Sequence, residues 1–145
     1  MSLRPELPLD WCSHEAARYA CEKWHYSKCI PKSKLVKIGV WEDKKFVGVV
    51  IFGVGATSDL VKRYGLKMEQ GCELVRIALS MHSTPVSRIV AISLKMLKQA
   101  NPLLRLVVSF ADPDQGHHGG VYQAGGWIFS GNSQASDEYI YKGKQ

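Results

Sequence analysis

After Ser13, apolar and polar residues recur with the period of an α-helix. Ser13 can cap a helix N-terminus with its hydroxyl group, and Pro31 blocks a helix from continuing far beyond His25–Lys28. The positions that share one stripe, spaced i, i+3, i+4 and i+7, are Ala17, Ala20, Cys21 and Trp24. The pattern predicts a helix that starts after Ser13 and buries this stripe in a core.

Three segments with the composition of β-strands follow. Leu35–Trp41 and Phe46–Phe52 are rich in β-branched and aromatic residues and flank a short turn, which predicts a hairpin. Cys72–Ser80 alternates between two faces and predicts a third strand. Two short helices are predicted as well, at Asp59–Tyr64 and Gly120–Ala124.

A second long helix has the clearest start in the chain. Thr84 precedes Pro85, and this pair suits an N-cap residue followed by proline at the first helical position. Its apolar stripe comprises Val86, Ile89, Val90, Leu94 and Leu97. Pro102 closes the helix. The next segment, Leu103–Phe110, contains one charged residue, Arg105, and predicts a central strand buried on both faces.

Two final strands are predicted at Trp127–Ser130 and Tyr139–Lys142. The strand–helix–strand unit across Cys72–Phe110 implies a right-handed parallel crossover, whereas hairpins give antiparallel neighbours. The predicted fold class is therefore α/β, a mixed sheet flanked by helices. In such sheets ligands bind beyond the carboxyl ends of the parallel strands, here at Ser80–Ser87 and Ala111–His118.

Composition limits the function classes. The chain has 145 residues with 46% hydrophobic and 22% charged residues, the mixture of a globular domain rather than a disordered chain. It has no apolar run long enough for a membrane span and no secretory signal, so we expect a cytoplasmic protein without membrane contact. None of the four cysteines forms a C-x-x-C pair, which favours reduced thiols over a zinc site.

The net charge of +6 favours a polyanionic partner. Between Lys28 and Lys45 there are six lysines and two acids, a local charge of +4. This stretch is either a solvated edge or a surface that holds the DNA backbone without reading its sequence. The DNA-binding candidates in it are Lys28, Lys32, Lys34 and Lys37.

Two stretches resemble Gcn5-related N-acetyltransferases (GNAT proteins): Glu73–Ser80 with the helix after it, and Gly120–Trp127, where a tyrosine stands four residues before a glycine–aromatic pair. The resemblance implies one GNAT-like domain over residues 1–145. It implies two central strands that splay apart, with acetyl-CoA or a related acyl-CoA between them. It also implies that Tyr122 protonates the departing CoA thiolate; simple packing is the alternative role.

The loop before the second long helix departs from that superfamily, whose pyrophosphate loop carries two glycines. Ser83–Arg88 has none, so close approach of the backbone to a phosphate is less favoured. A helix N-terminus still offers unpaired N–H groups and a favourable dipole. The cofactor-binding candidates are Arg76, Ser80, Ser83, Thr84, Ser87 and Arg88.

Three motifs resemble the Mom family of phage DNA-modification proteins. They are His25-Tyr26-Ser27, Leu74-Val-Arg76, and Ser109-Phe-Ala-Asp112-Pro with its Gly-His-His-Gly-Gly tail. The resemblance covers most of the chain. It implies a GNAT-like fold, double-stranded DNA as partner, and conversion of adenine to an N6-carbamoylmethyl derivative that protects phage DNA from restriction in the host cytoplasm. Iron is implicated in the family's chemistry.

The same positions are chemically sensible by themselves. Asp112 closes a predicted buried strand and can accept a proton from an exocyclic amine or orient it; an Asp-Pro turn is the alternative. His25 and Tyr26 follow the first helix, where a neutral histidine can act as general base, or both can simply pack. The pooled side chains of His25, Tyr26 and Asp112 would offer the nitrogen and oxygen ligands that suit iron. His117 and His118 can contact phosphate or stack on a base.

Three functions remain open at this point. The first is a transferase that modifies adenine N6 in DNA. The second is an acyl-CoA-dependent N-acetyltransferase acting on a small-molecule or protein amine, against which the missing loop glycines count. The third is a nucleic-acid-binding module without chemistry, which would show a steep salt dependence. The sequence does not fix the group donor, the DNA context or the oligomeric state.

Overall fold

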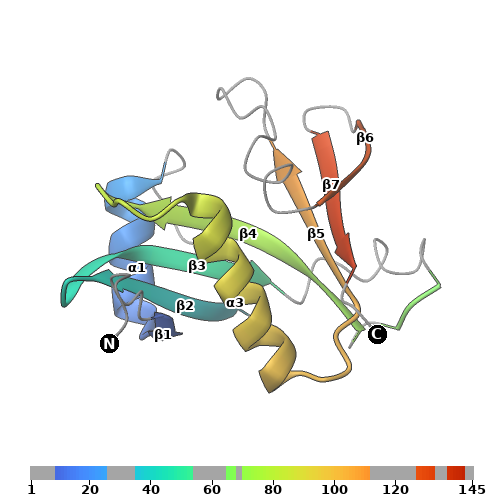
Figure 1. The fold of residues 1–145 in the computed structure, drawn as a ribbon, viewed down its shortest axis with the longest axis horizontal. Coiled ribbons are helices and arrows are strands. Elements are labelled where there is room, and N and C mark those ends of the chain that lie inside the picture. The colour runs from blue at the N-terminus through green and yellow to red at the C-terminus, as the bar shows by residue number, and fades with distance from the viewer. Residues whose placement is uncertain are drawn as a thin grey trace, which may run out of the picture.

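A computed structural model describes residues 9–25, 35–53, 65–67, 70–111, 127–132 and 137–142 of the chain (Figure 1). Within these ranges seven strands form one sheet in the order β1-β2-β3-β4-β5-β7-β6. The strands are β1 Leu9–Trp11, β2 Leu35–Glu42, β3 Lys45–Gly53, β4 Gly71–Leu79, β5 Leu106–Ala111, β6 Ile128–Asn132 and β7 Asp137–Lys142; the helices are α1 His14–Trp24 and α3 Val86–Ala100. The predicted mixed α/β sheet is confirmed.

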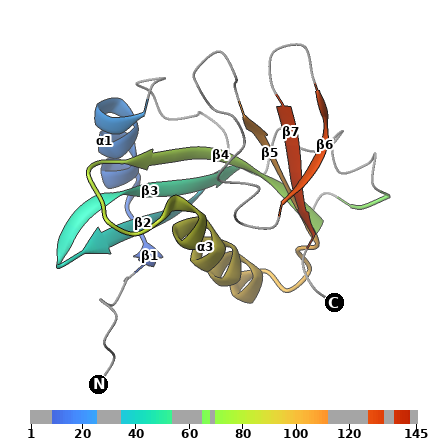
Figure 2. The same ribbon diagram turned by 45° about the horizontal axis from the view of Figure 1, so that its top comes forward.

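The two helices cover opposite faces of the sheet (Figures 1 and 2). The predicted stripes are confirmed as their buried sides, because apolar side chains on one helical face exclude water from the sheet. On α1 the buried stripe packs with Val49 and Ile51 of β3. On α3 it packs with Val50 and Phe52, the alternate positions of the same strand. Each face of β3 therefore has its own core.

The parallel crossover is also confirmed, with β4 and β5 paired side by side. Their pairing extends only from Gly71 opposite Leu106 to Leu74 opposite Ser109, although β4 continues to Leu79. Figure 1 shows the two strands running in different directions beyond this point. A register shift in β4 coincides with the separation, since Leu74 pairs with Phe52 and Arg76 pairs with Ile51.

Several local predictions require correction. The short strand β1 was not predicted, because three residues are too few to show a period. The strand predicted from Leu103 begins at Leu106 instead: Leu103 is 60% exposed and Leu104 donates its N–H to the Asn101 carbonyl in a turn. The short helices predicted at Asp59–Tyr64 and Gly120–Ala124 lie outside the described residues.

The hairpin between β2 and β3 closes with a two-residue turn. Asp43 and Lys44 both have positive φ angles, 50° and 67°, as the tightest hairpin turns require. Glu42 and Lys45 pair directly on either side of the turn. This geometry holds the Glu42 backbone at the tip of a hairpin.

In the described part of the chain, neither α1 nor α3 combines the length and apolar composition that a membrane-crossing helix needs.

Cys72 is expected to resist alkylation in the native protein. It is 4% exposed, and burial, with a smaller contribution from the charge of Glu73, raises the pKa of its thiol to about 12. At pH 8 the native thiol therefore contains about a thousandfold less thiolate than an ordinary cysteine. Mass spectrometry after iodoacetamide treatment should find Cys72 unlabelled in the folded protein and labelled in urea. Equal labelling rates in both states would contradict its burial.

Candidate active site between the separating strands

The candidate site lies where β4 leaves β5. From Val75 to Leu79, β4 pairs with β3 on one side and with no strand of the described residues on the other. The charged residues of β4 are Arg76, which lies within this segment, and Glu73, which lies two residues before it; the loop from Ser80 to Pro85 follows the strand. The carboxyl end of a parallel strand is the usual place for a ligand in such a sheet.

Arg76 has the most unusual environment of the predicted cofactor residues. Its pairing partner Ile51 belongs to the core beneath α1, which places Arg76 on the α1 face of the sheet. One terminal nitrogen donates to the Val75 carbonyl at 3.0 Å. Its Nε atom is buried, and none of the described residues accepts a hydrogen bond from it. A buried N–H of a guanidinium group without an acceptor is costly, so this atom is suited to an acceptor supplied by a ligand.

Glu73 lies near Arg76 in β4 and was not among the predicted site residues. Burial raises the pKa of the Glu73 carboxyl, and the nearby Arg76 charge opposes this shift. A carboxyl group whose pKa is raised by burial beside a cationic side chain is common at functional sites. A weak signal for it was present in the sequence, because Glu73 is an acidic residue in a predicted strand whose only other charged residue is Arg76.

His25 lies at the end of α1, four residues beyond the buried Cys21 and on the same stripe. Its ring is buried, at 8% exposure, and its backbone N–H donates to the Cys21 carbonyl at 3.2 Å. The helix has an extended residue at this C-cap, with φ −106° and ψ 143°. Because α1 packs on β3 and β4, the end of the helix brings His25 to the side of the sheet that Arg76 faces.

The Glu42 carboxylate links the loop between β4 and α3 to the β2–β3 hairpin through hydrogen bonds. Glu42 accepts hydrogen bonds from the Ser83 N–H at 3.0 and 3.2 Å, from the Thr84 N–H at 2.9 Å and from the Thr84 hydroxyl at 2.7 Å. The hydroxyl hydrogen bond of Thr84 is the main reason that the pKa of Glu42 is lowered, and the two backbone N–H groups add to it. Glu42 is therefore anionic at neutral pH.

These bonds overturn the predicted role of Thr84 as helix N-cap. The helix begins at Val86, Pro85 is its N-cap, and no side chain caps it. The Thr84 hydroxyl donates to Glu42 instead of accepting from the helix, since a hydrogen bond to an ionised carboxylate is stronger than one to a neutral amide. Nothing local in the sequence revealed this contact, because Glu42 and Thr84 are 42 residues apart.

The other predicted cofactor residues have different surroundings. Ser80 is hydrogen-bonded to β3: its N–H and its hydroxyl both donate to the Val47 carbonyl, at 2.7 and 3.2 Å. Ser87 is half-buried and Arg88 is exposed in the first turn of α3, which contains no acidic residue. Their positions therefore leave them open to an anionic group at the helix N-terminus.

Lys37 is separated from His25 by the length of α1. It lies on β2, half-buried, with its Nζ 3.5 Å from the Nδ1 of His14 at the start of that helix. The 11 residues of α1 span about 16 Å. Lys37 and His25 are therefore not brought together. The remaining predicted site residues lie outside the described residues: Tyr26, Lys28, Lys32, Lys34, Asp112, His117, His118 and Tyr122.

The described residues include no cluster of three His, Cys, Asp or Glu side chains able to hold a metal ion. Of the three residues predicted to bind iron, only His25 is among them. Among the described residues three features fit an acyl-CoA better: the edge of β4 that no described strand pairs with, the Arg76 Nε that no described residue accepts from, and the N-terminus of α3. The Ser83 and Thr84 donors, however, already hold the Glu42 carboxylate.

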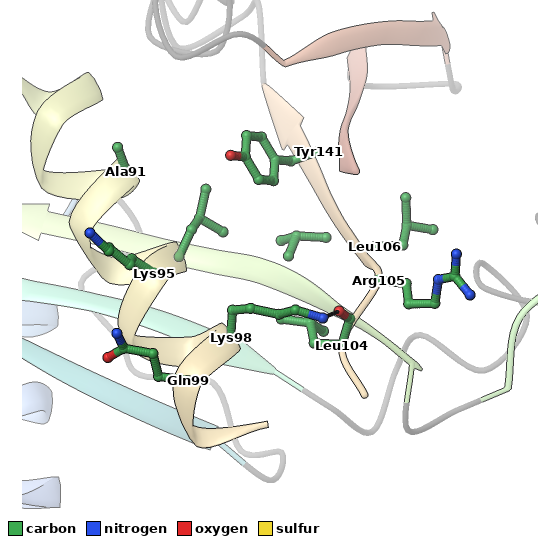
Figure 3. A pocket seen from close by; sticks show the side chains of 10 residues that line it. Ala91, Lys95, Lys98, Gln99, Leu104, Arg105, Leu106 and Tyr141 are labelled. Carbon is green, nitrogen blue, oxygen red and sulfur yellow. Dashed lines mark hydrogen bonds between the residues drawn. The ribbon is translucent and has the colours of Figure 1, made fainter. Parts of the chain in front are cut away.

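A cavity of about 540 Å³ lies elsewhere, between α3 and the strands β5 and β7 (Figure 3). It is lined by Ala91, Leu94, Lys95, Lys98, Gln99, Leu104, Arg105, Leu106, Val107 and Tyr141. Lys98 is not free to bind a ligand there, because its ammonium group donates to the carbonyls of Pro102 and Leu104 at 2.7 and 2.6 Å. The cavity faces the second half of α3 and is distinct from the loop that Glu42 occupies.

Solved structures with the same fold are N-acetyltransferases and a related acyl transferase. The PaiA N-acetyltransferase of Thermoplasma acidophilum, solved with coenzyme A, superimposes with a TM-score of 0.62 over 94% of this chain and 99% of its own, at 12% identity. FeeM, an N-acyl amino acid synthase from uncultured soil microbes, gives 0.68 over 98% and 93%, also at 12% identity. The described architecture is therefore the GNAT fold.

A relative in sequence is methylcarbamoylase Mom of Escherichia phage Mu, 29% identical over 135 residues. The alignment covers 90% of this chain and 56% of the Mu protein, so the chain matches little more than half of that relative's length. The sequence model of the Mom protein family matches residues 6–145. This match extends over nearly the whole chain and confirms the resemblance seen in the three motifs: the chain belongs to the Mom protein family.

Proposed function

We propose that this protein is a transferase that adds a carbamoylmethyl-type group to N6 of adenine in double-stranded DNA. The observation that carries the proposal is the match of residues 6–145 to the Mom family, whose phage Mu member is named a methylcarbamoylase. The separation of β4 from β5 supports the transferase part, because it provides a backbone edge along which a donor can bind. Modification of phage or prophage DNA in this way would protect it from restriction.

The reaction requires adenine N6 to form a bond with a carbon of the incoming group and to lose one proton. That amine is paired in the duplex, so the base must be flipped out. We assign proton acceptance or orientation of the amine to His25 and Asp112, and Tyr26 is proposed as a further catalytic residue. Tyr122 is assigned to protonate the leaving group. Arg76, with its buried and unpaired Nε, is assigned to an acceptor atom of the donor.

The donor is proposed to be a coenzyme A derivative that lies along β4 from Val75 to Leu79, where no described strand pairs with it on that side, and that carries the carbamoylmethyl group through its CH2 carbon. As the bond between N6 and this CH2 carbon forms, the bond between the carbon and the sulfur of coenzyme A would break, and the thiolate would leave with the proton assigned to Tyr122. The first turn of α3 would hold its phosphates through Ser87 and Arg88, since this turn has no acidic residue to repel them. Phosphates of the DNA backbone would be held by the lysine stretch and by His117 and His118, in keeping with the net charge of +6.

Expression of the protein in bacteria tests the function directly. Host DNA is digested to nucleosides and analysed by mass spectrometry, with DNA from cells carrying an empty vector as control. We expect a new deoxyadenosine derivative with the mass of a carbamoylmethyl addition. Unmodified DNA from cells that contain abundant folded protein would contradict the proposal.

The alternative function is acyl-CoA-dependent acetylation of a small-molecule or protein amine. The fold favours it, because a structural neighbour, PaiA, was solved with coenzyme A. It predicts turnover of acetyl-CoA with a free amine in the absence of DNA. Release of coenzyme A from acetyl-CoA and a simple amine, measured with the purified protein without DNA, would favour this alternative over DNA modification.

A further inference from the structure

Glu42 supplies an internal anion to the loop in which a donor's phosphate is expected. The loop joins β4 to the N-terminus of α3, and its donors Ser83 N–H, Thr84 N–H and Thr84 Oγ1 all point at one carboxylate. Pro85 follows and has no N–H. A phosphate that used the same donors would have to share them with a negative charge at hydrogen-bond distance, which is strongly unfavourable.

We propose that Glu42 competes with the phosphate groups of the donor for the β4–α3 loop and must leave it for the donor to bind. The inference rests on the coenzyme A-linked donor of the proposed function. When no donor is bound, the carboxylate takes the place that water would otherwise have at the N–H groups of the exposed Ser83 and the half-buried Thr84.

Displacement requires a side-chain movement and leaves the hairpin backbone in place. The turn at Asp43 and Lys44 is fixed by its positive φ angles, and Glu42 stays paired with Lys45 across it. The Glu42 side chain sits at the tip of this hairpin, and its rotation about two or three single bonds releases the loop. The loop therefore binds the Glu42 carboxylate when no donor is present and a phosphate of the donor when the donor is bound.

Coenzyme A is the probe for the test. Its binding is measured by calorimetry for the wild type, Glu42→Gln, Glu42→Ala and Asp43→Asn. The last variant is the matched control: it removes the same charge from the adjacent exposed residue, and Asn tolerates a positive φ. We expect Glu42→Ala to bind coenzyme A about tenfold more tightly, Glu42→Gln to fall between, and Asp43→Asn to stay within about twofold of wild type.

Amide hydrogen exchange provides a readout that does not depend on activity. In Glu42→Ala without ligand, the Ser83 and Thr84 amides should exchange faster than in the wild type, and coenzyme A should restore their protection. Weaker binding of coenzyme A by Glu42→Ala would overturn the proposal, because it would show that Glu42 holds the loop in the conformation that binds the donor. Equal affinity in all four proteins, or no binding by any of them, would also overturn the proposal.

The experiments distinguish failure of the competition by Glu42 from failure of the proposed function. DNA modified by the wild type, with coenzyme A affinities that do not depend on Glu42, would overturn the competition alone. Tighter binding by Glu42→Ala together with unmodified cellular DNA would support the competition and overturn the assignment of DNA as substrate.

Discussion

Cells that express the His25→Ala variant are expected to contain no detectable modified deoxyadenosine. We assign His25 to the deprotonation or orientation of adenine N6, and loss of a general base typically lowers a rate by about 100- to 10,000-fold. The structure supports this assignment with a ring that is 8% exposed at the end of α1, on the same face of the sheet as Arg76. Nucleoside mass spectrometry measures the modification.

The control for this variant is His14→Ala. His14 is exposed at the opposite end of the same helix, where it contacts Lys37, and its loss should leave modification near the wild-type level. The melting temperature of His25→Ala must also be compared with that of the wild type, because the ring is buried. A folded His25→Ala protein that modifies DNA at the wild-type level would eliminate a chemical role for this residue.

Gly48→Ala is expected to give the largest loss of stability. Gly48 has a φ of +156° in the middle of the sheet and pairs with Leu79 of β4. A Cβ atom at this position would collide with the carbonyl oxygen of Ala78 and lie 2.8 Å from the Cα of Leu79. Because both are backbone atoms, the strands themselves would have to separate. We expect a loss of about 3 kcal/mol or more in the free energy of unfolding.

Thermal unfolding measures this effect, with Gly65→Ala as the control. Gly65 also has a positive φ, 72°, but a Cβ there would meet no atom of the described residues within 4 Å. Gly65→Ala therefore incurs backbone strain without a collision and should cost about 1 kcal/mol. A Gly48→Ala protein that melts within a degree of the wild type would contradict the close approach of β3 and β4.

Much of the fold follows from local patterns in the sequence. The stripe from Ala17 to Cys21 defined α1, and its buried residues are those that the helical period selects. The stripe from Ile89 to Leu97 did the same for α3. Alternation and β-branched residues located β2, β3 and β4, and the helix between two strands required the parallel pairing of β4 with β5.

The sequence by itself determined both long helices, every described strand except β1 and, through three motifs, the Mom family, because these depend on patterns among residues close together in the chain. Tertiary structure decided the surroundings of the site. The hairpin brings Glu42 to Thr84 across 42 residues. The separation of β4 from β5 ends their pairing at Leu74 and accompanies the burial of Arg76 Nε. Such contacts depend on strand register and packing between distant segments, which no local period or propensity encodes.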